Sequence, residues 1–149
     1  MPYNTANAIE RLREMVAVKT PFVHQGRSIN GTDCVGALVY GFQYDGAVPS
    51  YPRDPVNGEL ERELRRVFGE PLLYRTNLLD PPLSKAALRE LDIVSCQYAG
   101  PVRHVATVAN HPALPGQLSL IHTNALTGYV VEHILDDKWM RRVVGVWRP

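Results

Sequence analysis

Residues 32–42 read Thr32-Asp33-Cys34-Val35-Gly36-Ala37-Leu38-Val39-Tyr40-Gly41-Phe42. Thr32 or Asp33 is a suitable N-cap, because a short polar side chain there accepts a hydrogen bond from an unpaired backbone N–H. Apolar residues spaced three and four apart then line one helical face: Val35, Leu38, Val39 and Phe42. The stretch predicts a helix that carries Cys34 in its first turn.

A second helical pattern precedes this segment. Its apolar stripe, at positions i, i+3 and i+4, is formed by Ala8, Ile9, Leu12, Met15 and Val16. We expect Asn4 or Thr5 to cap this helix and the helix to end at Val18–Thr20, before Pro21.

Residues 58–68 predict a charged amphipathic helix that ends at Gly69. The proline-rich stretch before it, over 47–57, predicts an ordered loop. The apolar residues expected to face inward are Leu60, Leu64 and Val67. The charged residues expected to face water are Glu61, Arg62, Glu63, Arg65 and Arg66. Residues 84–91 predict one or two further helical turns, capped by Ser84.

The chain after Asp92 changes from helical to strand patterns. Apolar and β-branched runs bounded by turn residues predict five strands: Ile93–Tyr98, His104–Ala109, Gln117–His122, Gly128–Ile134 and Val143–Trp147. Helices followed by antiparallel strands are typical of the α+β class. We expect a single domain over residues 1–149, with N-terminal helices packed on an antiparallel sheet of about five strands.

Charge and hydropathy exclude several classes of protein. Sixteen Lys and Arg against fifteen Asp and Glu give a net charge of +1, which lacks the basic excess of a nucleic-acid binder. Residues 1–15 have no signal-peptide pattern and no apolar run is long enough to span a membrane. We expect synthesis in the cytoplasm, no membrane insertion and no nucleic-acid partner. Two cysteines are too few for a disulfide framework, although a bridge between them stays open.

Cys34, His104 and His122 form the candidate catalytic set. The positive end of the helix dipole favours a thiolate, so we expect a lowered pKa for Cys34. His104 begins a predicted strand and is a suitable base, and His122 ends the next strand and can orient His104 through a ring-to-ring hydrogen bond. The alternative is that Cys34 is a small buried apolar residue, as most free cysteines are.

The other histidines and the second cysteine have simpler interpretations. His24 lies in the loop before Cys34, where a packing role and a substrate or oxyanion role are equally compatible with the sequence. His111 is expected in a solvated turn and Cys96 in the core. His133 follows Glu132 at a strand end, where we expect a cross-strand surface pair. A zinc site at the candidate catalytic set is chemically possible, but the paired spacings of zinc motifs are absent, so we predict no metal and no cofactor.

Three motifs in order resemble the NlpC cell-wall cysteine peptidases, and more narrowly the branch encoded in phage tail gene clusters. The nucleophile segment of that family is similar to Thr20-Pro21-Phe22-Val23-His24-Gln25-Gly26-Arg27 followed by Thr32-Asp33-Cys34-Val35-Gly36. The second and third motifs are similar to His104-Val105-Ala106-Thr107-Val108 and Ile121-His122-Thr123. Residues 136–148 resemble the end of phage members, so the resemblance covers about Ile9 to Arg148.

The resemblance implies a papain-like fold and hydrolysis of an amide bond in peptidoglycan stem peptides, commonly between D-glutamate and the diamino acid. It implies that Cys34 is the nucleophile, His104 the general base and His122 the orienting residue. Its implied partners are the stem peptide and phage or phage-like tail proteins, with the enzyme carried in a tail and acting at the cell wall.

Two departures from the family pattern leave alternatives open. Phe22 stands where many relatives have a tyrosine whose hydroxyl helps to hold the oxyanion, so the donor must be the Cys34 backbone N–H or the side chain of His24 or Gln25. The segment 110–116 is longer than usual and either shapes the cleft or is tolerated. The rival hypotheses are a non-catalytic tail assembly protein and a cytosolic amidase or acyltransferase, both on the same fold.

Overall fold

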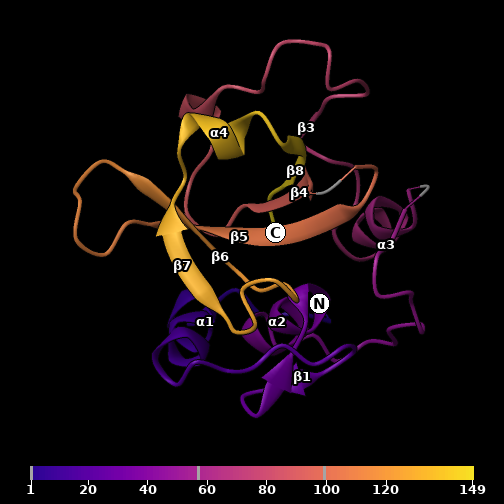
Figure 1. Cartoon of the computed structure of the whole chain (residues 1–149), viewed down its shortest axis with the longest axis vertical. Helices are drawn as coiled ribbons and strands as arrows, with labels where there is room; N and C mark the ends of the chain where they lie inside the picture. The colour runs from indigo at the N-terminus through magenta and orange to yellow at the C-terminus, as the bar shows by residue number, and fades with distance from the viewer. Residues whose placement is uncertain (1, 57, 99) are drawn as a thin grey trace.

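The computed structural model describes residues 2–56, 58–98 and 100–149, and over these ranges it has an α+β fold (Figure 1). The helices are α1 (Ala8–Ala17), α2 (Cys34–Gly41), α3 (Glu59–Phe68) and α4 (Asp137–Met140), with a 3₁₀ turn at Lys85–Ala87. The strands are β1 (Arg27–Ser28), β2 (Gly31–Thr32), β3 (Leu73–Tyr74), β4 (Ile93–Gln97), β5 (Arg103–Asn110), β6 (Leu118–His122), β7 (Val131–Ile134) and β8 (Val143–Trp147). The expected α+β class is confirmed.

The main sheet is antiparallel and has six strands over the described ranges, in the order β3-β8-β4-β5-β6-β7. All five expected strands form, and the sixth, β3, pairs through Leu73↔Val146 and Tyr74↔Gly145. A two-residue strand is too short to show the alternation by which strands are recognised in a sequence. β1 and β2 form a separate small sheet.

Alternating side chains give this sheet two apolar faces. Ala106 and Val108 of β5 pack on one face with Met140 of α4, whereas Val105 packs on the other face with Leu38 of α2. Figure 1 shows α1 and α2 below the sheet and α4 above it. Neighbouring residues of one strand are therefore directed toward different helices.

Two helical segments differ from expectation because the predicted N-cap residues do not cap them. α1 begins at Ala8, because its N-cap is Asn7 in the left-handed region, and neither Asn4 nor Thr5 caps it. The segment expected to form one or two helical turns contains only the short 3₁₀ turn, and the Ser84 side chain makes no capping bond. The start of α2 agrees with the sequence, since Asp33 is its N-cap and accepts from the Gly36 N–H.

The expected outward position of Glu61 is wrong. Its side chain is buried, and it accepts a hydrogen bond at 2.7 Å from the Arg103 Nε–H of β5. A buried carboxylate needs a cation or several donors nearby, and the partner comes from a strand 42 positions further along the chain. Nothing in the local pattern of charges in α3 signals that partner.

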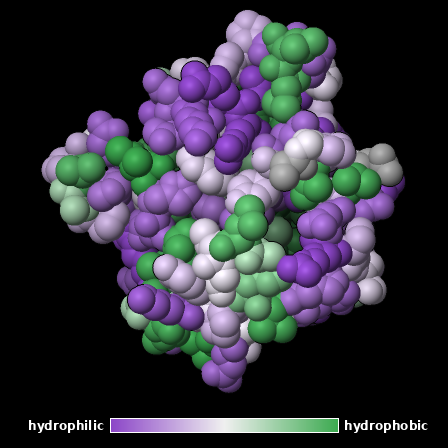
Figure 2. Space-filling model, in the orientation of Figure 1, coloured by the Kyte–Doolittle hydropathy of each residue, from purple (hydrophilic) through white to green (hydrophobic). Residues whose placement is uncertain are grey.

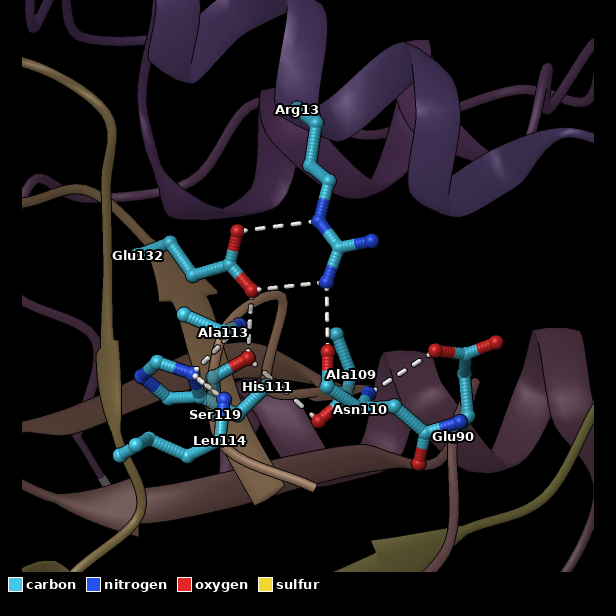
Figure 3. A network of polar contacts seen from close by, with 9 residues as sticks. All are labelled: Arg13, Glu90, Ala109, Asn110, His111, Ala113, Leu114, Ser119 and Glu132. Atoms are coloured by element: carbon cyan, nitrogen blue, oxygen red, sulfur yellow. Dashed lines mark hydrogen bonds and ion pairs between the residues drawn. The ribbon is translucent and has the colours of Figure 1, made fainter. Parts of the chain in front are cut away.

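A polar network ties α1 to the edge strand β7 (Figure 3). Arg13 of α1 donates two hydrogen bonds, each of 3.0 Å, to the carboxylate of Glu132 and a third to the Asn110 carbonyl. The Ser119 hydroxyl of β6 donates to the same carboxylate. In the sheet, β7 is an edge strand that pairs with β6 alone. The Arg13 network adds a second attachment, between β7 and α1 on one face of the sheet.

The surface has no extended face of one polarity in the orientation of Figure 2, where hydrophilic and hydrophobic residues alternate over the visible side. Among the described residues, no helix has both the length and the apolar character needed to cross a membrane.

Gly36 is expected to be essential for the seating of α2. A Cβ at this position would overlap the carbonyl oxygen of Gly26 and crowd Thr32, both of which belong to the loop that leads into the helix. Alanine normally stabilises a helix interior by about 1 kcal/mol relative to glycine. We expect Gly36→Ala to reverse this sign and to lower the free energy of unfolding by about 3 kcal/mol in a urea titration.

Val39→Ala is the matched control, because Val39 lies in the same helix and is only half-buried. It should cost about 1 kcal/mol. A stability of Gly36→Ala equal to or above that of the unmodified protein would contradict the close packing of α2 on the loop.

Candidate active site

The strands β5 and β6 separate at the end where β5 begins and β6 finishes. Their ladder runs from Thr107↔Ile121 to Asn110↔Leu118 and so stops short of His104. The start of α2 fills this opening, where backbone N–H groups of Val105, Val35 and Cys34 itself approach the Cys34 sulfur. The predicted position of the cysteine, in the first turn of a helix beside the sheet, is confirmed.

A cavity of about 330 Å³ lies over this opening and reaches both Cys34 and His104. Its walls come from four segments that are distant in the sequence: the loop before α2, the proline-rich segment after α2, the β4–β5 connection and the turn after β6. The polar residues of the walls include Asp33, Tyr51, Arg53, Tyr98, Thr123 and Asn124. The Thr123 hydroxyl is buried and has no hydrogen-bond partner in the part of the chain that the structure describes.

Three histidine rings form a continuous chain of hydrogen bonds that starts at the cavity. His104 Nε2 lies 2.9 Å from His122 Nδ1, so the expected ring-to-ring bond is present. His122 Nε2 in turn lies 2.7 Å from His133 Nε2 of β7. The expected cross-strand pair of His133 forms with His122 of β6, but it is part-buried beside Trp139 and not at the surface. Glu132 faces α1, whereas His133 faces the other side of the strand.

Aromatic rings cover this histidine chain. Trp139 of α4 lies 5.0 Å from the ring centres of both His122 and His133, and Tyr98 lies 5.5 Å from His104. The Arg142 guanidinium stacks on the outer aromatic layer, 4.9 Å from Trp139. His104 and His122 are consequently buried, which shields their hydrogen bond from competing water.

Burial keeps the two inner histidines neutral. It lowers the pKa of His104 to about 4, with His133 as a further cause, and it lowers the pKa of His122 to about 2, with His104 and His133 as further causes. At neutral pH both rings therefore carry one proton each, and each has one nitrogen that donates and one that accepts.

The expected lowering of the Cys34 pKa is wrong. Burial raises the pKa of the thiol to about 12, and the Asp33 carboxylate raises it further, while the neighbouring backbone N–H groups lower it by less. The helix start does favour a thiolate, but the loss of hydration outweighs this effect. At neutral pH the Cys34 thiol and the His104 imidazole are therefore both uncharged.

Cys34 and His104 border the same cavity but are not hydrogen-bonded to each other among the described contacts. His104 lies opposite Cys96 in the β4–β5 ladder, on the α4 face, whereas Cys34 packs beside Val105 on the α2 face. What the two residues share is the cavity at this end of the sheet, which both of them line. Catalytic hydrogen bonds are often long in a ligand-free site and shorten when substrate binds.

His24 and Gln25 take part in the support of the Asp33 cap and are absent from the cavity walls that the structure describes. The Gln25 backbone N–H donates to Asp33 Oδ2 at 2.7 Å, and its side chain donates to Ser50 and to the Tyr51 carbonyl. His24 Nδ1 lies 3.8 Å from Asp33 Oδ2. Of the three expected oxyanion donors, the Cys34 backbone N–H is the one at the cavity.

Tyr51 is a site residue that the sequence reasoning missed. Its hydroxyl donates to Asp33 Oδ2 at 2.6 Å, and its ring borders the cavity. Burial and this hydrogen bond raise the pKa of Tyr51, so the phenol remains a donor. The only signal in the sequence was the expectation that the proline-rich segment 47–57 forms an ordered loop; residues 47–56 of it are described.

Three remaining residues or segments have structural roles. His111 Nδ1 accepts from the Ala113 and Leu114 N–H groups and so orders the β5–β6 turn (Figure 3). That turn lies at the opposite end of β5 from His104, so segment 110–116 does not shape the cavity. Cys96 is buried in the core as expected, and the two cysteines are not bridged.

No known family model matches the sequence, and no curated protein matches it. Within the described residues, no group of three or more histidine, cysteine, aspartate or glutamate side chains is placed to hold a metal ion.

The raised thiol pKa predicts slow alkylation of Cys34 at neutral pH. We expect iodoacetamide to modify it more than about tenfold more slowly at pH 7 than in the urea-unfolded chain, because little thiolate is present. The rate should continue to rise up to pH 10, since the folded thiol ionises well above the usual value of about 8.5. Mass spectrometry of the Cys34 peptide measures the rate. A plateau at or below pH 8 would show that the helix dipole dominates.

Proposed function

We propose that the chain is a cysteine peptidase of the NlpC type with a papain-like fold, which hydrolyses an amide bond in peptidoglycan stem peptides, in particular the D-glutamyl-diamino acid bond. The observation that carries this proposal is the shared cavity of Cys34 and His104, with His104 hydrogen-bonded to His122 at 2.9 Å. A thiol, a base and an orienting residue are the three parts that thiol-dependent amide hydrolysis requires.

In the acylation step the Cys34 thiol gives its proton to the free ring nitrogen of His104 as the sulfur attacks the amide carbon. The neutral state of both groups makes this transfer part of the attack itself. His104 then gives the same proton to the leaving amine as the C–N bond breaks. In the second step water adds to the acyl group, His104 accepts its proton, and the C–S bond breaks to return the thiol.

The tetrahedral intermediate requires hydrogen-bond donors on its oxygen. The backbone N–H of Cys34 at the start of α2 serves this purpose, because it is one of the unpaired donors of a helix N-terminus. The Thr123 hydroxyl on the cavity wall is buried without a partner in the described ranges and supplies a second donor. Phe22, which lines the cavity, supplies none.

The cavity also suits a substrate that carries a carboxylate, as stem peptides do. Arg53 lines the cavity and holds its guanidinium 5.7 Å from the centre of the Phe22 ring. Stacking on an aromatic face orients the planar cation and leaves its N–H groups available for a carboxylate. We further propose that phage or phage-like tail proteins carry the enzyme to the cell wall.

The alternative function is a non-catalytic tail assembly protein on the same fold. The neutral thiol and the lack of a described hydrogen bond between Cys34 and His104 favour it. The two functions differ in whether the purified chain cleaves a stem peptide.

We expect the purified chain to release a new amino group from a stem tetrapeptide and from peptidoglycan, as measured by amine labelling and mass spectrometry. Cys34→Ala and His104→Ala should each lower kcat/KM by at least about 10³-fold, because each removes a group that bonds to the reacting atoms. Cys96→Ala is the matched control, since it removes the second thiol from the core and leaves the cavity intact. It should retain activity.

Full activity in Cys34→Ala or in His104→Ala would contradict the thiol mechanism. A folded wild-type chain that cleaves neither substrate would favour the assembly role.

A further inference from the structure

The histidine chain does not end at His122, which the resemblance assigns as the third residue of the site. It continues to His133, whose Nδ1 lies 2.9 Å from the backbone carbonyl oxygen of Ile134. A carbonyl oxygen can only accept a hydrogen bond, so the proton of this contact must be on His133 Nδ1. One end of the chain therefore has a fixed direction.

This direction passes from ring to ring. When His133 carries a single proton, that proton is on Nδ1 and Nε2 is an acceptor, so His122 donates to it from Nε2. Neutral His122 then has an unprotonated Nδ1, and His104 must donate to that atom from its own Nε2. His104 is left with an unprotonated Nδ1, which is the lone pair that a general base needs.

We propose that His133 is a positioning residue, which acts through His122 to hold His104 in the tautomer with an unprotonated Nδ1. The catalytic consequence rests on the proposed thiol chemistry, whereas the tautomer itself does not. The alternative state of the histidine chain has both of its ring-to-ring hydrogen bonds in the reverse direction. If His133 Nε2 carried a proton, His122 would donate from Nδ1 and His104 would carry its proton on Nδ1, where it could not accept one from Cys34.

Two contacts hold His133 in place for this role. In β7 the preceding residue, Glu132, is fixed on the α1 face by Arg13 and Ser119 (Figure 3). Because successive strand residues face opposite sides, His133 is directed to the other face, next to Leu120 in the ladder and under Trp139. The ring is therefore constrained by strand geometry as well as by its hydrogen bonds.

The test compares two substitutions of similar size. His133→Gln can accept from His122 Nε2 through its side-chain oxygen and can still donate to the Ile134 carbonyl through its amide, so it preserves the direction of the chain. His133→Phe keeps an aromatic ring beside Trp139 but has no acceptor. Without the acceptor, the donor direction of His122 is no longer imposed.

The first readout is the protonation of the two ring nitrogens of His104, measured by ¹⁵N NMR of histidine-labelled protein at pH 8, where an ordinary imidazole is neutral. We expect an unprotonated Nδ1 in the wild type and in His133→Gln. We expect His133→Phe to show a substantial population with the proton on Nδ1. This readout requires no enzymatic activity.

The second readout is the hydrolysis of the stem tetrapeptide. His133→Phe should lower kcat by about 10²-fold with KM unchanged, because general base catalysis supplies about that factor. His133→Gln should retain most of kcat.

A wild-type His104 that carries its proton on Nδ1 would overturn the proposal, and so would a His133→Phe variant with the wild-type tautomer. If His133→Phe does not fold, the wild-type spectrum and the His133→Gln variant still decide the assignment. A wild type with the expected tautomer and no hydrolysis would overturn the proposed function and leave the assignment of the histidine chain standing.

Discussion

The carboxylate of Asp33 is the constraint on which the candidate site depends. It is buried, and it accepts hydrogen bonds from the Gly36 N–H, the Gln25 N–H and the Tyr51 hydroxyl at 2.6–2.7 Å. A buried charge is costly unless donors surround it, and these three donors come from α2, from the loop before it and from the proline-rich segment after it. Satisfying one carboxylate therefore brings together two walls of the cavity, the loop before α2 and the proline-rich segment, and fixes the start of α2.

The same burial sets the chemistry of the site. Asp33 raises the pKa of the adjacent Cys34, and the removal of water raises it more, so the cap that positions the thiol also keeps it protonated. Burial lowers the pKa of His104, so this imidazole is neutral as well. A site in which the thiol and the imidazole are both uncharged avoids the cost of a buried ion pair. Under the proposed thiol chemistry, the proton would move only when the sulfur attacks the amide carbon.

The sequence predicted the features that follow from local patterns. These features are the position of Cys34 in the first turn of α2 and the positions of five strands along the chain. Both depend on caps, periodicity and turn residues within a few positions. The features that it missed depend on contacts between distant segments. Glu61 is buried because Arg103 reaches it, and Tyr51 belongs to the site because its hydroxyl donates a hydrogen bond to Asp33. The two-residue strand β3 has no pattern of its own and forms because β8 offers an unpaired edge.

His133 shows the same limit most clearly. The sequence predicted a cross-strand surface pair for this residue, yet its cross-strand partner is the buried His122, while the α1 network holds Glu132 on the opposite face. The pKa of a neutral imidazole does not show whether it can accept a proton from a given neighbour, because the same pKa is compatible with a lone pair on either ring nitrogen. A base must have its lone pair on the nitrogen that faces the proton donor. In the proposed arrangement, the Ile134 carbonyl oxygen at the far end of the histidine chain determines which nitrogen of His104 is unprotonated. The proposed tautomer of His104 therefore depends on a residue of the edge strand β7, which is far from Cys34 in the sequence.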